Sequence, residues 1–447
     1  MSSQDGNAKA FGLWSAIFLG IGSMVGAGIF IVIGQAGAIA GNIVWLSFVL
    51  GGIAALLSGY SLAKLALRYP SRGGIVEYLV QGYGEGVFSG AASVLFYFAG
   101  LIAIAAIAKS FGTYAATFWH AQAEGWVVDA FALGVLGFFL LVNLIGATFV
   151  ARSENLIVII KVTILTVFAI AALFTVKPQY LSAAQMPPLK DMLFATGLTF
   201  FAYQGFSVIT NTVEDMENPA RTMMRAMMGA IAIVALLYIV TAVAVLGNLP
   251  LEKVIETKDY ALAEAAKPVF GVWGFKIMAA TALLATASAI NASLYATADI
   301  GYTMAKEGNL PKIYSYNVFR SFEGLIISTL LIVPLVLFFD LTEVTTVAAL
   351  AVLVVQGLTH VGHMMRLKET GANPVLVTLA ALAMFAISGM TLVYTSRHEP
   401  MIGYYLLGAF ALAFLVEIGL RLATKRIVTR QIVDLFNIKR WEEEKRI

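Results

Sequence analysis

Long apolar runs follow one another along almost the whole chain, and no other feature restricts its possible folds as strongly. Two of them extend over residues 127–142 and 226–246. A bilayer core of roughly 30 Å needs about 20 apolar residues per helix, whereas barrel strands would alternate apolar and polar positions. Hydrophobic residues make up 60% of the 447 residues and charged residues 12%, so the surrounding solvent must be lipid. We therefore expect an all-α membrane protein.

Charged residues, prolines and glycines interrupt the apolar runs and divide the chain into about twelve predicted transmembrane helices. The expected spans are 12–40, 43–66, 87–116, 127–148, 153–176, 190–214, 224–247, 270–304, 322–340, 344–364, 374–395 and 401–423.

Basic residues are distributed unevenly between the predicted loops. With the N-terminus in the cytoplasm, about 20 of the 29 Lys and Arg lie on the cytoplasmic side and about six on the other. This asymmetry predicts that both tails, 1–11 and 424–447, are cytoplasmic. The polar start MSSQDGNAKA precedes a long run without a small-residue cleavage pattern, so we expect no removable signal peptide.

Several classes of function are excluded by the composition. The chain has no cysteine, which rules out disulfides and iron–sulfur clusters, and its net charge of +3 is too small for nucleic-acid binding. His360 and His363 have a spacing suited to a shared metal, but no third ligand is evident. No nucleophile–base pair or cofactor loop is recognisable. We expect no enzyme activity, no metal and no cofactor.

The first predicted span contains GIGSMVGAGIF, in which Gly20, Gly22, Gly26 and Gly28 lie within nine residues. Glycine costs roughly 1 kcal/mol per helical position relative to alanine, so the cluster needs a reason. One reason is close helix packing through Gly22 and Gly26. The other is a break in mid-membrane, where free backbone N–H groups receive a carboxylate. Such a break is tolerated only where it lines a cavity.

The sixth predicted span reads FATGLTFFAYQGFSVITNTVEDMENPARTM, with Gly197 and Gly205 on either side of aromatic residues and of the amide Gln204. Paired interruptions in corresponding spans of two halves indicate a transporter site between repeats. The residue before a proline is biased out of helical conformation, so we expect the chain to turn at Asn218–Pro219. The sequence therefore predicts a second broken helix.

Lys161 stands among apolar residues in the fifth predicted span. It follows Arg152 by nine residues, which places it about 13 Å deep at about 1.5 Å per residue. Snorkelling toward water is the simpler alternative, but this depth favours an inward-facing lysine with a partner. Burial disfavours the charged ammonium form, so the amine is suited to proton release.

The eighth predicted span supplies polar groups on one helical face, because their spacings are seven, three, four and four residues. A polar stripe in a lipid-embedded helix should turn inward. Ser288 lies near mid-span, and we expect it to hydrogen-bond Lys161, with Ser23 or nearby carbonyls as the other wall. The stripe consists of Thr281, Ser288, Asn291, Tyr295 and Asp299.

Three motifs resemble those of the amino acid–polyamine–organocation superfamily of permeases. They are GSMVGAGIF, FFAYQGFSVITNTVEDMENPAR and ASAINASLYATADIGYTMAKEGNLP, in the family's order and spacing. The resemblance implies a leucine-transporter-like fold with alternating access. It implies inverted repeats over 12–176 (spans 1–5) and 190–364 (spans 6–10), with two further spans over 374–423.

The resemblance also implies where an α-amino acid binds. Its carboxylate would meet the backbone at Gly26, Ala27 and Gly28. Phe201 matches the position of an aromatic gate, and several relatives have an apolar residue in place of Gln204. That amide either faces the substrate or holds the unwound backbone. The resemblance implies that further residues bind the substrate, several of them through carbonyls that meet its amino group. They are Ile21, Ser23, Phe201, Ala202, Gln204 and Gly205.

Spans five and eight are most similar to the ApcT-type, proton-coupled amino acid transporters. In that subgroup a lysine at the position of Lys161 replaces the sodium ion of related transporters. The resemblance implies proton symport in the cell inner membrane, with the proton as coupling ion and Lys161 and Ser288 as coupling residues. An exchanger and a non-transporting amino acid sensor are the alternatives. The expected partners are an amino acid and the lipid bilayer, with a monomer or homodimer equally compatible and no nucleic acid.

Overall fold

The computed structural model describes residues 12–26, 28–71, 73–119, 125–145, 148–182, 186–216, 218–318 and 321–424. The predicted tails, apart from Thr424, and the predicted site residue Ala27 lie outside these residues. The described chain is built almost wholly of helices, with one short antiparallel pair of strands, β1 and β2. It is an all-α membrane protein, as the sequence predicts.

The first half of the chain contains eleven described helical elements. They are α1 (Leu13–Met24), α2 (Gly28–Ala40), η1 (Gly41–Ile43), α3 (Val44–Arg68), α4 (Ile75–Tyr83), α5 (Val87–Trp119), α6 (Gly125–Ile145), α7 (Thr148–Leu173), η2 (Pro178–Leu181), α8 (Leu189–Ala202) and η4 (Phe206–Asp215).

The second half continues with long helices joined by short ones. They are α9 (Pro219–Asn248), α10 (Leu251–Glu256), α11 (Ala261–Glu264), α12 (Lys267–Glu307), η5 (Lys312–Ser315), β1 (Asn317–Val318), β2 (Ser321–Phe322), α13 (Glu323–Phe338), α14 (Leu341–Met364), α15 (Leu367–Thr370), α16 (Pro374–His398) and α17 (Pro400–Thr424).

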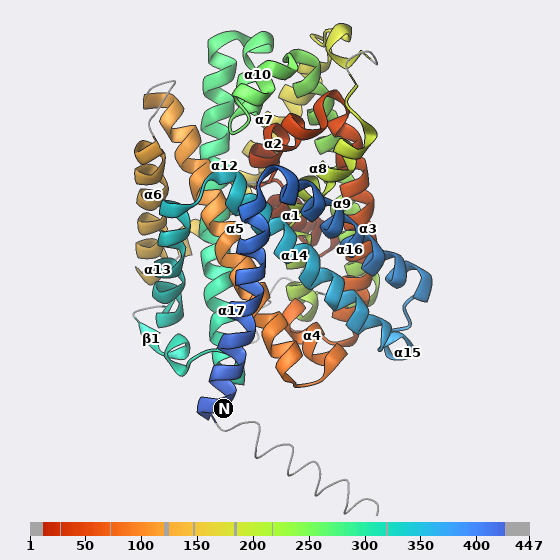
Figure 1. Cartoon of the computed structure of the whole chain (residues 1–447), viewed down its shortest axis with the longest axis vertical. Coiled ribbons are helices and arrows are strands. Elements are labelled where there is room, and N and C mark those ends of the chain that lie inside the picture. The colour runs from red at the N-terminus through yellow and green to blue at the C-terminus, as the bar shows by residue number, and fades with distance from the viewer. Residues whose placement is uncertain are drawn as a thin grey trace, which may run out of the picture.

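Ten helical segments within the described residues are long and apolar enough to cross a membrane, one of them running through α2 and α3. The apolar helices α1 and α13 are shorter. Figure 1 shows the long helices as one elongated bundle, with α10 at its upper end and α4 and α15 at its lower end. The sequence did not predict α4, α10 or α11, because such short helices carry too few residues for a periodic pattern.

Local sequence explains where several helices begin. Pro219 starts α9 directly after Asn218, which confirms the predicted turn. Asp340 caps α14 through a reciprocal pair of hydrogen bonds with Glu343, each 2.8 Å long. Asn373 accepts a hydrogen bond of 2.9 Å from the backbone of Val375 at the start of α16. These caps fix the ends of helices whose faces pack inside the bundle.

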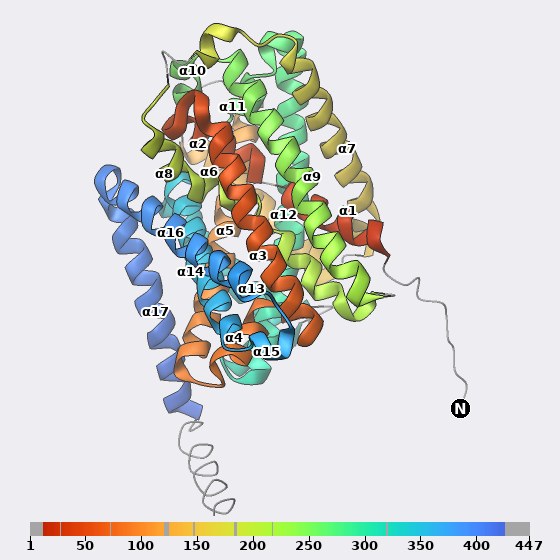
Figure 2. The same ribbon diagram turned by 90° about the vertical axis from the view of Figure 1, so that its right-hand side faces the viewer.

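Both predicted helix breaks are confirmed. The first expected span divides into α1, which ends at Met24, and α2, which begins at Gly28. The second break separates α8 from η4, and Gly205 there has a φ of 116° that favours glycine. In Figure 2, α1 lies beside α9 and α7 at one side of the bundle. The glycine clusters are therefore interruptions as well as packing positions.

The helices pack closely at the end of the bundle that carries α10 and α11. A methyl group on Gly34 of α2 would overlap the carbonyl of Lys258, in the segment between α10 and α11. That atom belongs to the backbone, so it cannot move aside as a flexible side chain would. Only a glycine allows this approach.

Gly34→Ala should therefore destabilise the protein by about 1–3 kcal/mol through overpacking. Gly389→Ala is the matched control, because a methyl group there has no neighbour within 4 Å and the position is also inside a helix. The control should be neutral or stabilising by up to about 1 kcal/mol. The melting temperature of each purified variant in detergent measures the difference, and equal melting temperatures would contradict the packing.

Candidate functional site

The two helix breaks lie against each other. A methyl group on Gly28 would come within 2.6 Å of the carbonyl oxygen of Ala202, and one on Gly205 within 2.6 Å of Oγ of Ser23. The backbones therefore approach more closely than any side chain would permit. Four of the predicted site residues, two from each helix break, therefore meet in one junction.

Tyr238 of α9 joins the two breaks through one hydroxyl. It donates to the carbonyl of Met24 at 2.7 Å and lies 3.3 Å from the carbonyl of Ala202. The side chain is fully buried. These carbonyls end α1 and α8, where helices leave backbone acceptors unpaired. Sequence reasoning missed Tyr238, although a single tyrosine in an apolar span was a usable signal.

The remaining predicted residues surround this junction. The carbonyls of Ile21 and Phe201 each accept a backbone hydrogen bond, from Val25 at 2.8 Å and from Gln204 at 3.0 Å. A methyl group on Gly26 would lie 3.2 Å from Cβ of Ala289 in α12. The first break therefore faces α12 beside the predicted residue Ser288, and its other face meets the second break.

Lys161 reaches the first break from α7. Its Nζ donates a hydrogen bond of 2.8 Å to the carbonyl of Gly22, and the side chain is 1% exposed. The helices approach closely, since a methyl group on Gly22 would lie 2.6 Å from Cγ2 of Val158. The lysine therefore faces inward and contacts span one. The direct hydrogen bond between Lys161 and Ser288 stays a prediction, and Ser288 is itself buried.

The predicted polar stripe on α12 is correct only in part. Thr281, Ser288 and Asn291 are buried, and Asn291 accepts a hydrogen bond of 2.9 Å from Asn143 of α6. Tyr295, however, is 65% exposed, and Asp299 is exposed as well. The expectation that Tyr295 turns inward was wrong, because the neighbouring helices cover α12 only as far as Asn291 on this face, whereas Asp299 was expected near the cytoplasmic end in a structural ion pair.

The two histidines of α14 lie between α14 and α3, fully enclosed. Both ring nitrogens of each histidine lie within hydrogen-bond distance of a serine or threonine hydroxyl. Within the described part of the chain, no group of three or more His, Cys, Asp or Glu could hold a metal ion. Their spacing of three residues therefore serves hydrogen bonding to α3 and α15.

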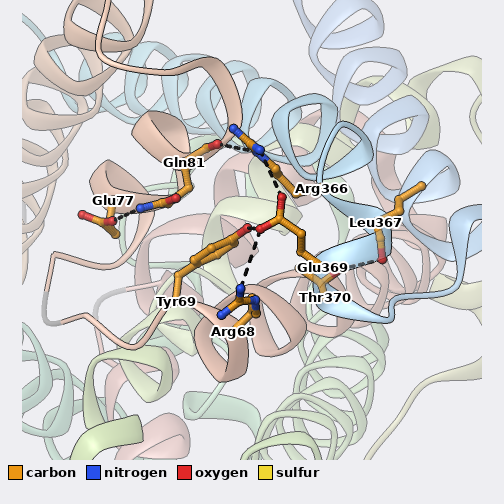
Figure 3. A network of polar contacts seen from close by, with 8 residues as sticks. All are labelled: Arg68, Tyr69, Glu77, Gln81, Arg366, Leu367, Glu369 and Thr370. Atoms are coloured by element: carbon orange, nitrogen blue, oxygen red, sulfur yellow. Dashed lines mark hydrogen bonds and ion pairs between the residues drawn. The ribbon is translucent and has the colours of Figure 1, made fainter. Parts of the chain in front are cut away.

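Charged residues gather beyond the end of α14, as Figure 3 shows. Glu369 accepts hydrogen bonds from Tyr69 at 2.7 Å and from Arg366 at 3.0 Å, with Arg68 at 3.9 Å. These hydrogen bonds, that of Tyr69 first, hold the pKa of Glu369 below its ordinary value. Arg366 also donates to the carbonyl of Gln81 at 2.8 Å, so the cluster ties α3, α4 and α15 together.

Comparisons with known proteins agree on one family. A family model described as amino acid permease matches residues 11–418. An uncharacterized protein of Methanocaldococcus jannaschii is 33% identical over 94% of this chain and 97% of its own length. The inner membrane transport protein YbaT of Escherichia coli is 37% identical over 79% of this chain and 83% of its own. The serine/threonine exchanger SteT of Bacillus subtilis is 27% identical over 69% and 71%.

Tyr238→Phe should loosen the junction, because two buried carbonyls lose their shared donor at a cost of about 1–3 kcal/mol. Hydrogen–deuterium exchange should increase in the backbone of residues 20–26 and 200–206. Tyr114→Phe is the matched control, since that buried hydroxyl donates to the carbonyl of Phe30 within α2 at 3.0 Å. Equal exchange at the two breaks in both variants would refute the bridging role.

Proposed function

This chain belongs to the amino acid permease family and is a multi-pass membrane transporter rather than an enzyme, and we propose that it carries α-amino acids by proton symport. The observation that supports proton coupling is the hydrogen bond between Lys161 and the carbonyl of Gly22, beside the first helix break. The substrate is a small molecule and the protein is embedded in the lipid bilayer.

The proposed architecture has twelve crossings, in which α1 with α2 and α8 with η4 each form one broken span. Residues 12–176 and 190–364 are the inverted repeats, and 374–423 supplies two further spans. Two glycine-interrupted helices in corresponding positions support this arrangement. We place the protein in the inner membrane with cytoplasmic termini, supported by the distribution of Lys and Arg and by the name of the Escherichia coli relative.

The proposed substrate site is the junction of the two breaks. The substrate carboxylate binds backbone N–H groups at Gly26, Ala27 and Gly28, where the start of α2 adds its positive dipole end. The amino group binds carbonyls near Ile21, Ser23, Phe201, Ala202 and Gln204. Backbone hydrogen bonds already engage the carbonyls of Ile21 and Phe201, and Tyr238 engages that of Ala202. We therefore assign the larger share of this contact to Ser23.

Lys161 couples the proton to movement of α1. A protonated amine donates a charge-assisted hydrogen bond to Gly22, roughly twice as strong as a neutral one. Loss of the proton weakens this attachment of α1 to α7 and frees the first half-helix to move. Ser288, on α12 next to the break, is the proposed second partner of the amine. No metal ion or cofactor is needed for this cycle.

Uptake of labelled amino acids into proteoliposomes tests the coupling. An inward gradient of one pH unit is worth about 1.4 kcal/mol per proton, which drives up to about tenfold accumulation. Wild-type protein should show this response and Lys161→Ala should lose it. Lys109→Ala is the matched control, because this other buried lysine is paired with Asp129 at 2.9 Å and lies in α5. It should keep the response.

Two results would overturn proton symport. Either the wild type ignores the gradient, or Lys161→Ala still responds to it. If uptake also requires amino acid inside the vesicles, the protein is an exchanger on the same fold. The name of the Bacillus subtilis relative, a serine/threonine exchanger, makes this the second candidate function.

A further inference from the structure

A row of hydrogen bonds leads from the second helix break into the interface of α14 and α3. Nε2 of Gln356 donates to Oε1 of Gln204 at 3.3 Å. The hydroxyl of Ser58 donates to Oε1 of Gln356 at 2.7 Å. Gln356 and Ser58 are both fully buried. Both ends of the Gln356 amide are therefore engaged, which fixes its orientation.

The row continues through the two imidazole rings of α14. Nε2 of His360 lies 2.9 Å from Oγ of Ser58, and its Nδ1 lies 2.9 Å from Oγ of Ser61. Nδ1 of His363 lies 2.7 Å from Oγ of Ser61, and its Nε2 lies 2.9 Å from Oγ1 of Thr370. The row thus runs without interruption from the break to α15.

Counting hydrogens gives the row a direction. Ser58 has one hydroxyl hydrogen and gives it to Gln356, so Ser58 must accept from Nε2–H of His360. The Nδ1 of that neutral ring is then an acceptor, which requires the hydroxyl of Ser61 as its donor. Ser61 in turn accepts from Nδ1–H of His363. From His363 onward, every hydrogen bond donates toward Gln204.

Gln204 ends the row with an unused donor. Its Oε1 is occupied by Gln356, and its Nε2 is buried without a hydrogen-bond partner among the described residues. A buried donor left unpaired costs about 1–3 kcal/mol. Gln204 stands in the break beside Gly205, which contacts Ser23 of the first break. The unpaired N–H group is therefore carried by a residue that adjoins the junction in which we propose that the amino acid binds.

The amide of Gln204 cannot simply rotate. Turning it by 180° would bring its Nε2 toward Nε2 of Gln356, so that two donors would face each other. Turning Gln356 as well would reverse every bond as far as His363. With Gln356 oriented as in the structure, the N–H group, rather than the carbonyl, is the group that Gln204 offers to a ligand.

We propose that Gln204 determines side-chain specificity by offering a hydrogen-bond donor, and that Ser58, Gln356 and His360 are positioning residues that hold it in this orientation. The inference rests on the proposed amino acid site. The preferred substrates are α-amino acids whose side chain carries an oxygen that accepts a hydrogen bond. Cationic side chains, which only donate, are disfavoured. A site built around an unpaired polar group rejects analogues that lack its partner.

Two isosteric ligands test the wild-type chain. L-O-methylserine and L-norvaline differ by an ether oxygen in place of a methylene group, and that oxygen can only accept. Isothermal titration calorimetry of the full-length protein in lipid nanodiscs should show about two- to tenfold tighter binding of L-O-methylserine. L-2,4-diaminobutyrate, whose side-chain ammonium only donates, should bind more weakly than either.

Each wild-type outcome separates this inference from the proposed function. Equal affinities for L-O-methylserine and L-norvaline would overturn the role of Gln204 and leave the amino acid site intact. If none of a panel of α-amino acids binds, the proposed function itself fails, and the inference fails with it.

Variants test the positioning role through ligand preference, which a merely structural role would not invert. Gln204→Leu should bring the affinity ratio of L-O-methylserine to L-norvaline to about one, or below it. Gln356→Glu introduces a group that only accepts, so Gln204 should turn its N–H toward it and offer its carbonyl to the ligand. The preference should then pass to L-2,4-diaminobutyrate.

Ser47→Ala is the matched control for the row. Ser47 is also buried on α3, but its hydroxyl donates to the carbonyl of Met192 at 2.7 Å, outside the row. This variant should keep the wild-type preference. If Gln356→Glu folds and still prefers L-O-methylserine, the positioning role is wrong. If it does not fold, Gln204→Leu decides alone, and an unchanged preference for L-O-methylserine in that variant overturns the inference.

Discussion

Backbone groups that a membrane helix leaves unpaired are costly in lipid, and this constraint governs the centre of the molecule. Two helices are interrupted, and the interruptions are set against each other, with Gly28 beside Ala202 and Gly205 beside Ser23. Tyr238 then supplies one donor to a carbonyl from each break. The surrounding helices are arranged around this junction because they enclose the groups that the interruptions expose.

Different helices bring a lysine and a polar amide to the junction. Lys161 reaches the carbonyl of Gly22 from α7, whereas Gln204 is held by Gln356 from α14. In the proposed transport cycle, a proton gained or lost on the lysine changes the attachment of α1. The row of hydrogen bonds that ends at Gln204 contains only neutral groups, so it orients the amide without changing the charge of the site. Coupling and selectivity can therefore vary independently on one backbone framework.

The sequence predicted the features that arise from local composition. Both breaks follow from glycine clusters in apolar spans, and the inward position of Lys161 follows from its depth. Tyr238 and Gln356 were missed because their partners, Met24 and Gln204, are 214 and 152 residues distant in the sequence. Helical spacing alone also misplaced Tyr295, since periodicity defines a face but not how far along the helix its neighbours cover it.

The polar row also shows how neutral groups in a membrane interior can form hydrogen bonds that all point the same way. Charged groups are costly inside a bundle, and those around Glu369 are confined to α15 and the adjoining ends of α3 and α4. From Thr370 inward the row uses only hydroxyls, imidazoles and amides. Neutral groups of this kind keep a direction because each hydroxyl, imidazole or amide within the row donates one hydrogen bond and accepts another. In α15, ionic contacts at Glu369 thus give way to ordered neutral hydrogen bonds that begin at Thr370.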